Sequence, residues 1–345
     1  MKVFRKNKEL WDLFTKKEEY NPVFIDKYDR FTYHFSKYNN PFYPKLSEFL
    51  IKNGFKIKYP GGKKFAVCLT HDVDILFYRN IRLKEIIESA RNLDFKKSLK
   101  ILYSTSNKDL VEGLSLERIM DLEEKYDAKS SFYFLSLNRR DLDFNYHLSE
   151  IKDSMKKIID RGFEVGLHGG HSAFNNLERL KKEKSMLEKI IKKQVIGYRS
   201  HYLRFNTPGT WEILSKSGFK YDTSFGYPDC VGFRNGMCHP FKPFNLNTDS
   251  YIDIFEIPLV FMDSTIDRYM LLDYENSLDL SKKLVDTVEG FNGVITFLFH
   301  NNKLSDDNLK LYDEILKYCK KKNAWMTSAE NIFDFYKEKN LVKEE

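Results

Sequence analysis

Short apolar runs alternate with longer amphipathic stretches along most of this chain of 345 residues. The first clear run, FAVCL at residues 65–69, is apolar at every position. Such a run is typical of a strand buried on both faces of a parallel sheet. Runs of this kind predict strands at residues 65–70, 130–137, 164–167, 195–198, 254–261, 294–299 and 324–327.

Stretches with helical periodicity lie between these strands, such as NLERLKKEKSMLEKIIKK at 176–193 and DDNLKLYDEILKYCKKK at 306–322. Seven strand-then-helix units indicate a parallel sheet with helices outside it. About 280 residues are available for these units, which is enough to close a barrel. We therefore expect the α/β class and a closed or nearly closed (β/α)7 barrel rather than an open sheet.

Residues 1–60 differ from the rest of the chain because they are rich in Tyr, Phe, Lys and Asn and show little strand pattern. Gly61 and Gly62 follow Pro60 and indicate a turn into the first strand. We expect residues 1–60 to form an N-terminal extension packed on the barrel, and residues 61–345 to form the barrel domain.

The charge pattern argues against a nucleic-acid partner. Lys and Arg number 57 against 50 Asp and Glu, and the basic residues are interspersed with acidic ones in the helical stretches. That mixture is typical of a solvated helix face. Aromatic residues make up 15% of the chain, and their rings can stack on sugars as well as fill a core.

The chain shows no signal-peptide pattern and no apolar run of membrane-spanning length. Its four cysteines, Cys68, Cys230, Cys238 and Cys319, form no CxxC pair and are too few for a disulfide scaffold. We therefore expect a cytoplasmic protein in a reducing compartment, without a membrane span.

Polar residues follow several of the predicted strands, where the sequence reads THDVD, GLHGGHSAF, GYRSHYLRF and TFLFHNN. In a parallel barrel the carboxyl ends of all strands share one mouth, which is where such folds place their sites. We therefore expect one cavity to receive Asp72, Asp74, His168, His171, Arg199, His201 and His300.

Two or three imidazoles with one carboxylate form a site for Zn²⁺ or a similar divalent ion, with a position left open for water. A second carboxylate close to the ion is the natural base for that water. Asp72 and Asp74 are two residues apart, so in an extended segment both side chains point to the same side. Each of these residues also has a structural interpretation, since Asp often caps a turn and a buried His is often only hydrogen-bonded.

The motifs LTHDVD, EVGLHGGHS, YRSHY and FLFH, in this order, resemble the polysaccharide deacetylase family, also called the NodB-homology or carbohydrate esterase 4 family. A divergent branch associated with surface-polysaccharide biosynthesis is the most similar. The resemblance covers about residues 63–335 and implies a distorted (β/α)7 barrel. It also implies one divalent metal ion, which we expect to be Zn²⁺, with Co²⁺, Ni²⁺ or Mn²⁺ as alternatives.

The resemblance assigns roles to the first two motifs. Asp72 matches the family's catalytic base, whereas the family's ligand Asp falls on Val73, so that Asp74 must supply the carboxylate. His168 matches the first ligand histidine. His171 stands three residues later, where the family has a spacing of four, so either His171 or His201 is the third ligand.

The resemblance also assigns roles to the later motifs. Arg199 matches the arginine that orients the catalytic Asp, and Tyr202 matches the following aromatic, where a backbone N–H helps to hold the oxyanion. His300 matches the general acid, and Asp222 in YDTSFGYPD matches a residue that supports the acid. We further expect His201, Tyr202 and Asp222 to lie at the substrate.

The stretch GFRNGMCHPFKPF at residues 232–244 reads as a loop over the mouth. Within it, Arg234 is a candidate for gripping a sugar hydroxyl or an anionic group, although an ordinary surface loop is an equally good interpretation.

Together these features predict a metal-dependent hydrolase that removes an N-acyl group, most simply acetyl, from an amino sugar. The substrate would be a nucleotide-linked, lipid-linked or oligosaccharide precursor. Three alternatives stay open: a deformylase or another C–N hydrolase on this scaffold, a carbohydrate-binding protein without catalysis, and a basic nucleic-acid-binding protein.

Overall fold

The structure, a computed structural model, describes residues 2–77, 108–304 and 306–342. Its centre is a sheet in which β1 (Ala66–Val73) pairs with β10 on one side and with β2 and β11 on the other. The path through the sheet is β8-β5-β4-β3-β2-β1-β10-β9, and all of these pairings are parallel. The strands besides β1 are β2 (Ser131–Leu135), β3 (Glu164–Gly169), β4 (Gly197–Ser200), β5 (Tyr221–Asp222), β8 (Phe255–Glu256), β9 (Phe261–Met262), β10 (Val294–Leu298) and β11 (Trp325–Thr327).

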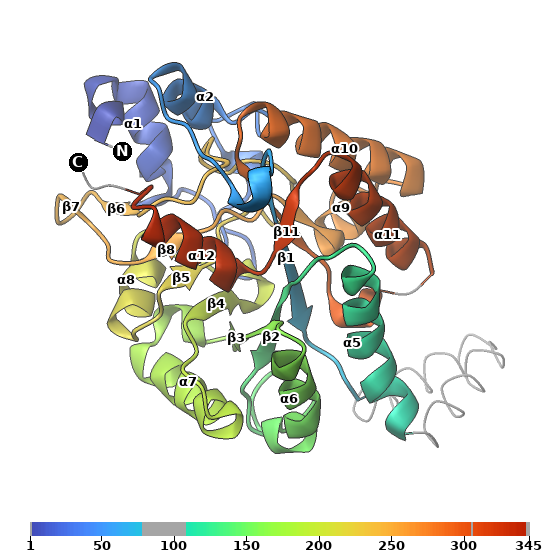
Figure 1. Ribbon diagram of the computed structural model, residues 1–345. Helices are drawn as coiled ribbons and strands as arrows, with labels where there is room; N and C mark the ends of the chain where they lie inside the picture. The colour runs from blue at the N-terminus through green and yellow to red at the C-terminus, as the bar shows by residue number, and fades with distance from the viewer. Residues whose placement is uncertain (1, 78–107, 305, 343–345) are drawn as a thin grey trace.

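Helices surround this sheet, as the ribbon drawing shows (Figure 1). They form where apolar residues recur at helical spacing and where a polar residue caps the first turn. In α7, Leu180 and Leu187 are buried, and the Asn176 side chain accepts a hydrogen bond from the Arg179 backbone N–H. The helices after β1 are α5 (Lys108–Glu124), α6 (Lys152–Asp160), α7 (Leu177–Ile191), α8 (Gly209–Lys216), α9 (Asp263–Arg268), α10 (Tyr274–Gly290), α11 (Asp306–Lys321) and α12 (Ala329–Glu338).

The prediction of one strand over residues 254–261 is wrong, because this segment forms two short strands at opposite edges of the sheet. Its first half, β8, pairs with β5, whereas its second half, β9, pairs with β10. The segment therefore connects the two edges, which gives the predicted barrel a distorted closure. A pattern of apolar residues does not reveal this split, since both halves are buried.

The amino end of the barrel is covered by α12, which lies in front of the strands in Figure 1. Phe333 of this helix packs against the rings of Tyr221 and Phe255. A buried cluster there also contains Ala66 and Cys68 of β1. Because this end is filled by apolar side chains, the carboxyl ends of the strands are left as the place for a site.

The N-terminal extension contains α1 (Lys8–Thr15) and α2 (Lys45–Lys52) and packs on the barrel through a buried ion pair. Arg234 donates to both carboxylate oxygens of Glu19 at 2.9 and 2.7 Å, and both side chains are buried. The structure thus places Arg234 in a contact with the extension and not at the cavity described below. Its predicted role in substrate binding is replaced by a structural one.

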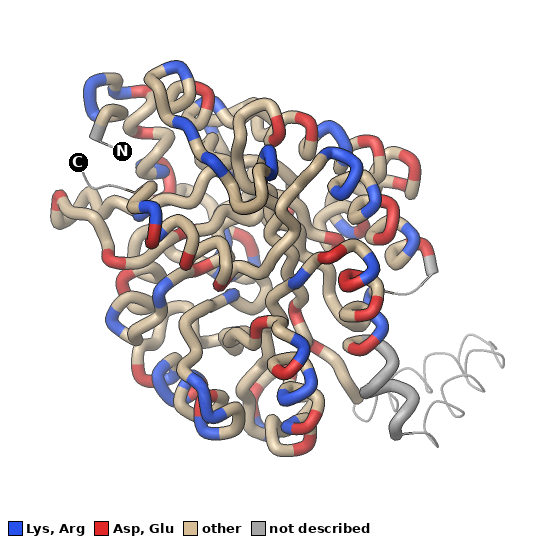
Figure 2. The backbone as a smooth tube through the Cα atoms, in the orientation of Figure 1, with Lys and Arg blue, Asp and Glu red and all other residues tan. Residues whose placement is uncertain are grey.

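Three further features concern the surface charge, the cysteines and the apolar character of the helices. Basic and acidic residues are interspersed along the outer helices (Figure 2). The four cysteines are all free and buried. No helix in the described part of the chain combines the length and the apolar character needed to cross a membrane.

Candidate active site

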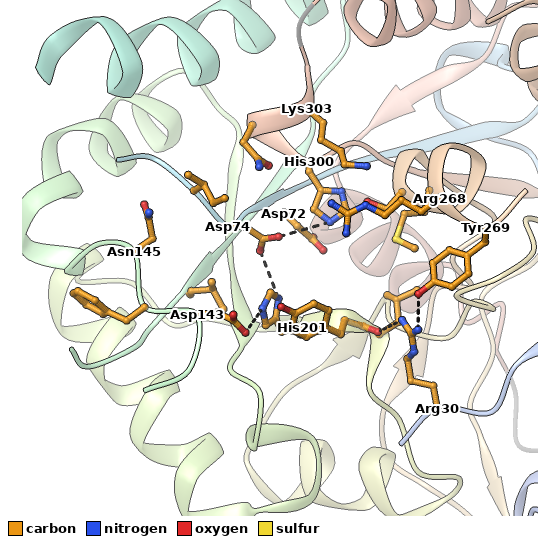
Figure 3. Close-up of a pocket in the computed structure, with 18 residues that line it drawn as sticks. Arg30, Asp72, Asp74, Asp143, Asn145, His201, Arg268, Tyr269, His300 and Lys303 are labelled. Atoms are coloured by element: carbon orange, nitrogen blue, oxygen red, sulfur yellow. Dashed lines mark hydrogen bonds and ion pairs between the residues drawn. The ribbon is translucent and has the colours of Figure 1, made fainter. Parts of the chain in front are cut away.

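A cavity of about 540 Å³ opens at the carboxyl ends of the strands (Figure 3). Three groups of residues line it: Asp72 and Asp74 at the end of β1, His201 and Tyr202 after β4, and His300 after β10. Cavities of this size hold ligands of the size of a sugar unit. Of the seven residues expected at a common mouth, Asp72, Asp74, His201 and His300 line this cavity, whereas His168, His171 and Arg199 do not.

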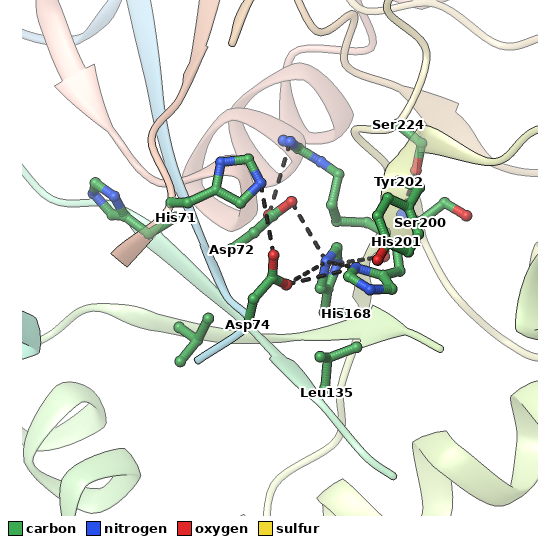
Figure 4. A network of polar contacts seen from close by, with 12 residues as sticks. His71, Asp72, Asp74, Leu135, His168, Ser200, His201, Tyr202 and Ser224 are labelled. Carbon is green, nitrogen blue, oxygen red and sulfur yellow. Dashed lines mark hydrogen bonds and ion pairs between the residues drawn. The ribbon is translucent and has the colours of Figure 1, made fainter. Parts of the chain in front are cut away.

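The two aspartates at the end of β1 point to the same side, as their spacing predicts. Asp72 is buried and Asp74 is partly exposed, and both line the cavity. His168 Nε2 lies 3.2 Å from Asp74 Oδ1 and 3.6 Å from Asp72 Oδ2. The two carboxylates thus share one imidazole, which brings β1 and β3 together in one site (Figure 4).

The ring orientations of His168 and His201 are set by hydrogen bonds on their outer sides. His168 Nδ1 donates to the carbonyl oxygen of Arg199 at 3.1 Å, so Nε2 is the nitrogen that faces Asp74. His201 Nε2 lies 3.2 Å from Asp143 Oδ2, and its Nδ1 lies 3.0 Å from His168 Nε2. Carboxylate and carbonyl partners of this kind are typical of ligand histidines.

Asp74, His168 and His201 form a candidate metal centre. One ligand atom from each residue lies within 4.8 Å of the other two. Asp74 Oδ1 is buried and makes no hydrogen bond of good geometry, although His168 Nε2 lies 3.2 Å and His201 Nδ1 3.5 Å away. Two imidazoles and a carboxylate are the donor set that Zn²⁺ and similar ions take in sites with an open position. The residues present therefore fit the ion that the sequence motifs imply.

The charges at this centre reinforce one another. Burial would raise the pKa of the Asp74 carboxyl, but His201 and His168 outweigh burial and lower that pKa below its usual range. Burial would lower the pKa of His168, but Asp72 and Asp74 raise it. Opposite charges so close together in a buried site stabilise each other's charged forms.

His171 lies outside this group. Arg204 Nη1 lies 2.9 Å from His171 Nε2 and also contacts Nδ1, and the same arginine donates to the His171 carbonyl oxygen. Burial and the positive charge of Arg204 lower the pKa of His171. The same guanidinium disfavours a metal cation beside this imidazole. In this structure His201, and not His171, lies with Asp74 and His168 in the candidate metal centre.

Arg199 lies beneath Asp72 and is fully buried. Its Nε donates to Thr223 Oγ1 and its Nη2 to Thr70 Oγ1, so the guanidinium is held from both sides. Arg199 Nη1 lies 3.9 Å from Asp72 Oδ1, and neither of these two atoms has a hydrogen-bond partner among the described residues. The arginine is placed to orient Asp72.

His300 forms a dyad with Asp263 on the opposite wall of the cavity. The Asp263 carboxylate accepts from His300 Nδ1 at 2.6 Å and from the His300 backbone N–H at 2.8 Å. His300 Nε2 consequently faces the centre, 3.8 Å from Asp74 Oδ2. Burial would lower the pKa of His300, but Asp263 and the two site aspartates raise it to about 9.

Asp222 lies away from the cavity and pairs with Glu256 on the neighbouring strand, at matching positions of β5 and β8. Both residues are buried. Asp222 Oδ1 accepts from the Ser224 backbone and hydroxyl, and Glu256 Oε2 accepts from Trp211 Nε1 at 2.8 Å. The residue that supports His300 is thus Asp263, and Asp222 is instead half of a buried carboxyl pair.

The carboxyl pair predicts a pH-dependent stability. Burial and the neighbouring Asp222 raise the pKa of Glu256 well above 4.5, its ordinary value. As pH rises above 4.5, the unfolded chain loses this proton first, so the free energy of unfolding falls until Glu256 also ionises in the folded state. Each pH unit in this range costs up to about 1.4 kcal/mol.

Glu256→Gln is expected to flatten this decrease, because an amide keeps a donor towards Asp222 and cannot ionise. Urea unfolding at several pH values between 5 and 8 measures the slope. Glu178→Gln on the exposed face of α7 serves as the control and should follow the wild-type slope. Parallel slopes for wild type and Glu256→Gln would contradict the prediction.

Tyr202 adopts an uncommon backbone conformation at the cavity wall. Its φ is +59° and that of Leu203 is +54°, values in the left-handed region that side-chain-bearing residues rarely adopt. Its ring stacks on Tyr28 of the extension at 4.8 Å, and its carbonyl oxygen accepts from Arg30. Such strained segments cluster at functional sites, where the surrounding contacts hold them in place.

Two residues of the site were not identified from the sequence. Asp263 directly follows β9, so it carries the same signal as Asp72, namely an acid after an apolar strand. The incorrect strand over 254–261 obscured it. Asp143 lies in the loop after β2, where nothing in the sequence distinguishes it from Asp141. His71, in contrast, is structural, since its Nε2 lies 2.8 Å from Glu123 Oε1 in the core.

Comparisons with known proteins identify the fold. No protein-family model and no curated protein matches the chain in sequence. Among solved structures, a Mycobacterium smegmatis protein named as a polysaccharide deacetylase is similar, with a TM-score of 0.57 and 15% identity over 83% of this chain and 94% of that one. The chain therefore shares the polysaccharide deacetylase fold that its motifs predict.

Two further structures are more distant. A carbohydrate esterase 4 family pseudoenzyme from Bacillus anthracis has a TM-score of 0.43 and 14% identity, over 80% of this chain and 67% of that one. The peptidoglycan deacetylase PdaC from Bacillus subtilis has a TM-score of 0.39 and 15% identity, over 82% and 95%. At these scores neither structure bears on the chemistry of this chain.

Proposed function

We propose that this protein is a metal-dependent hydrolase that removes an N-acyl group, most simply acetyl, from an amino sugar of a glycan or glycan precursor. The observation that carries the proposal is the placement of Asp74, His168 and His201 around one point, with Asp72 and His300 on two sides of it. A divalent ion held by these three residues would supply Lewis-acid chemistry, polarising the acyl oxygen and acidifying water.

Asp72 is proposed as the general base. Its carboxylate lines the cavity and lies beside His168, so it is close to the candidate centre without belonging to the ligand group. Arg199 holds it from behind, which fixes its direction. Asp72 takes the proton of the attacking water as the new C–O bond forms at the acyl carbon.

His300 is proposed as the general acid. Asp263 fixes its ring through Nδ1, so that Nε2 faces the cavity. As the tetrahedral intermediate collapses and the C–N bond breaks, His300 Nε2 gives a proton to the departing sugar amine. The base and the acid thus approach the reacting carbon from different elements, β1 and the loop after β10.

The position of Asp74 argues against the alternative of a binding protein without catalysis. That alternative rests on Val73, which stands where the family has its ligand Asp. Val73 is buried in β1, whereas Asp74 brings its carboxylate to both histidines, at 3.2 Å from His168 and 3.5 Å from His201. The substitution is therefore compensated one position later, which favours the hydrolase over the binding protein.

Acetate release from N-acetylated amino sugars tests the proposal. We expect the protein dialysed against a chelator to be inactive, and activity to return when Zn²⁺, Co²⁺, Ni²⁺ or Mn²⁺ is added. The panel should contain N-acetylglucosamine oligomers, nucleotide-linked sugars and the matching N-formyl sugars, so that a deformylase is recognised. Metal binding without release of any acid from the whole panel would support the binding protein instead.

A further inference from the structure

Most of the exposed apolar side chains lie on segments that continue into the cavity wall. Of the eight large hydrophobic or aromatic residues exposed in the described part of the chain, six lie on three loops that each contain a residue lining the cavity, namely Arg30, Asp143 or Tyr269. These residues are Val23, Phe24, Ile25, Leu142, Tyr269 and Leu271. Scattered single residues of this kind are ordinary, but a group around one opening marks an interaction surface.

Each of the three loops is anchored to the mouth by a residue that lines the cavity. Arg30 anchors the loop that carries Val23 to Ile25, Asp143 follows Leu142, and Tyr269 lies two residues before Leu271. Figure 3 shows these three anchors around the opening. Val23 is 85% exposed, Leu271 77% and Leu142 60%, so these side chains lie largely in solvent. Phe35 adds to the first loop by stacking on Phe24 at 5.0 Å.

The same three loops carry basic residues without acidic partners. Lys27, Arg139, Arg140 and Arg268 are exposed and form no ion pair with any residue that the structure describes. Five acids on these loops are paired: Asp26 with Arg30, Asp29 with Arg204, Asp141 with Arg179, Asp143 with His201 and Asp267 with Lys303. A sixth, Asp273, caps α10 through the Asn276 backbone N–H, so four unpaired basic residues stand against this one acid. The uncompensated charge around the mouth is therefore positive.

We propose that the cavity mouth docks on an anionic lipid surface, with the three loops inserting their apolar side chains among the head groups. Apolar tips flanked by Lys and Arg are the combination that such surfaces bind, because burial of the tips and attraction to anionic lipids act together. Combined with the proposed function, on which this further step rests, docking of this kind would present the head group of a lipid-linked glycan to the site.

Co-sedimentation of the full chain with vesicles tests the docking. The vesicles are made of phosphatidylcholine alone or with about 30% phosphatidylglycerol, which supplies the negative surface charge. We expect binding to the anionic vesicles and much weaker binding to the neutral ones. The variant Phe24→Ser/Leu142→Ser/Leu271→Ser is expected to bind the anionic vesicles at least about tenfold more weakly, since three exposed apolar groups are lost.

Phe42→Ser is the matched control. Phe42 is also an exposed aromatic residue, but it lies beside Tyr43, which packs against Phe291 just before β10 begins, away from the mouth. This variant should bind vesicles like the wild type. Thermal unfolding of both variants verifies that they fold, as expected for substitutions of exposed residues.

Three results would overturn the docking. The first is no sedimentation of the wild type with either vesicle at low salt. The second is equal binding by the triple variant, which would show a purely electrostatic contact. The third is a wild type that binds no vesicles but forms a concentration-dependent dimer in light scattering, while the triple variant stays monomeric. Failure of vesicle binding and failure of acetate release are separate observations, so either can occur without the other.

Discussion

Asp72→Asn is expected to reduce the rate of acyl hydrolysis by about 10²–10⁴-fold, because the amide cannot accept the proton of the attacking water. The variant should still bind metal, since Asp72 is not one of the three residues grouped as ligands. Asn is close in size to Asp and can occupy the same place beside Arg199. The loss should therefore appear in kcat, with little change in the free energy of unfolding.

Asp267→Asn is the matched control for this variant. Asp267 lies on α9 beside the mouth and pairs with Lys303 at 3.1 Å, but it is not among the residues that line the cavity. The same change of chemistry there should leave kcat within about twofold of the wild type, as for a surface ion pair. An Asp72→Asn protein with near wild-type kcat and full metal content would exclude Asp72 as the base.

His201→Ala is expected to weaken metal binding by at least about 100-fold, because loss of a ligand exceeds the 10- to 100-fold cost of removing an outer partner. His171→Ala is expected to leave the affinity almost unchanged, since its ring contacts Arg204 and not Asp74. Both residues are histidines that follow neighbouring parallel strands, β3 and β4, so each controls for the other. Calorimetric titration of the two metal-free variants with Zn²⁺ measures the difference.

The opposite order of affinities would contradict the assignment of His201. If His171→Ala lost the metal and His201→Ala retained it, His171 would be the third ligand despite its contact with Arg204. Asp143→Asn provides an intermediate case, because Asp143 supports His201 through Nε2 at 3.2 Å. A moderate loss of affinity in that variant would agree with its place behind the ligand.

The sequence predicted most of the sheet because its strands are buried on both faces and their apolar runs are local features. Strands such as β1 and β10 therefore lie within a few residues of their predicted positions. The clustering of Asp72, Asp74, His168 and His300 was also predictable, because it follows from parallel strand order alone. Once the strands are parallel, their carboxyl ends must meet.

The remaining features depend on contacts between distant parts of the chain. Arg234 pairs with Glu19, 215 residues away, and no local pattern around either residue indicates that contact. The choice between His171 and His201 depends on ring direction, which Arg204 and Asp143 set through hydrogen bonds. The strand over 254–261 divides because its two ends meet different edges of the sheet. Local periodicity carries none of this information.

The most direct test of the account is the metal content of the wild-type protein, beside that of Asp74→Ala and His168→Ala. After dialysis against Zn²⁺, Co²⁺ or Mn²⁺ and removal of free ions, elemental analysis should find about one ion per wild-type chain and almost none in either variant. A wild-type chain that stays empty with every ion, or variants that fill equally well, would contradict the proposed metal centre and the hydrolysis built on it.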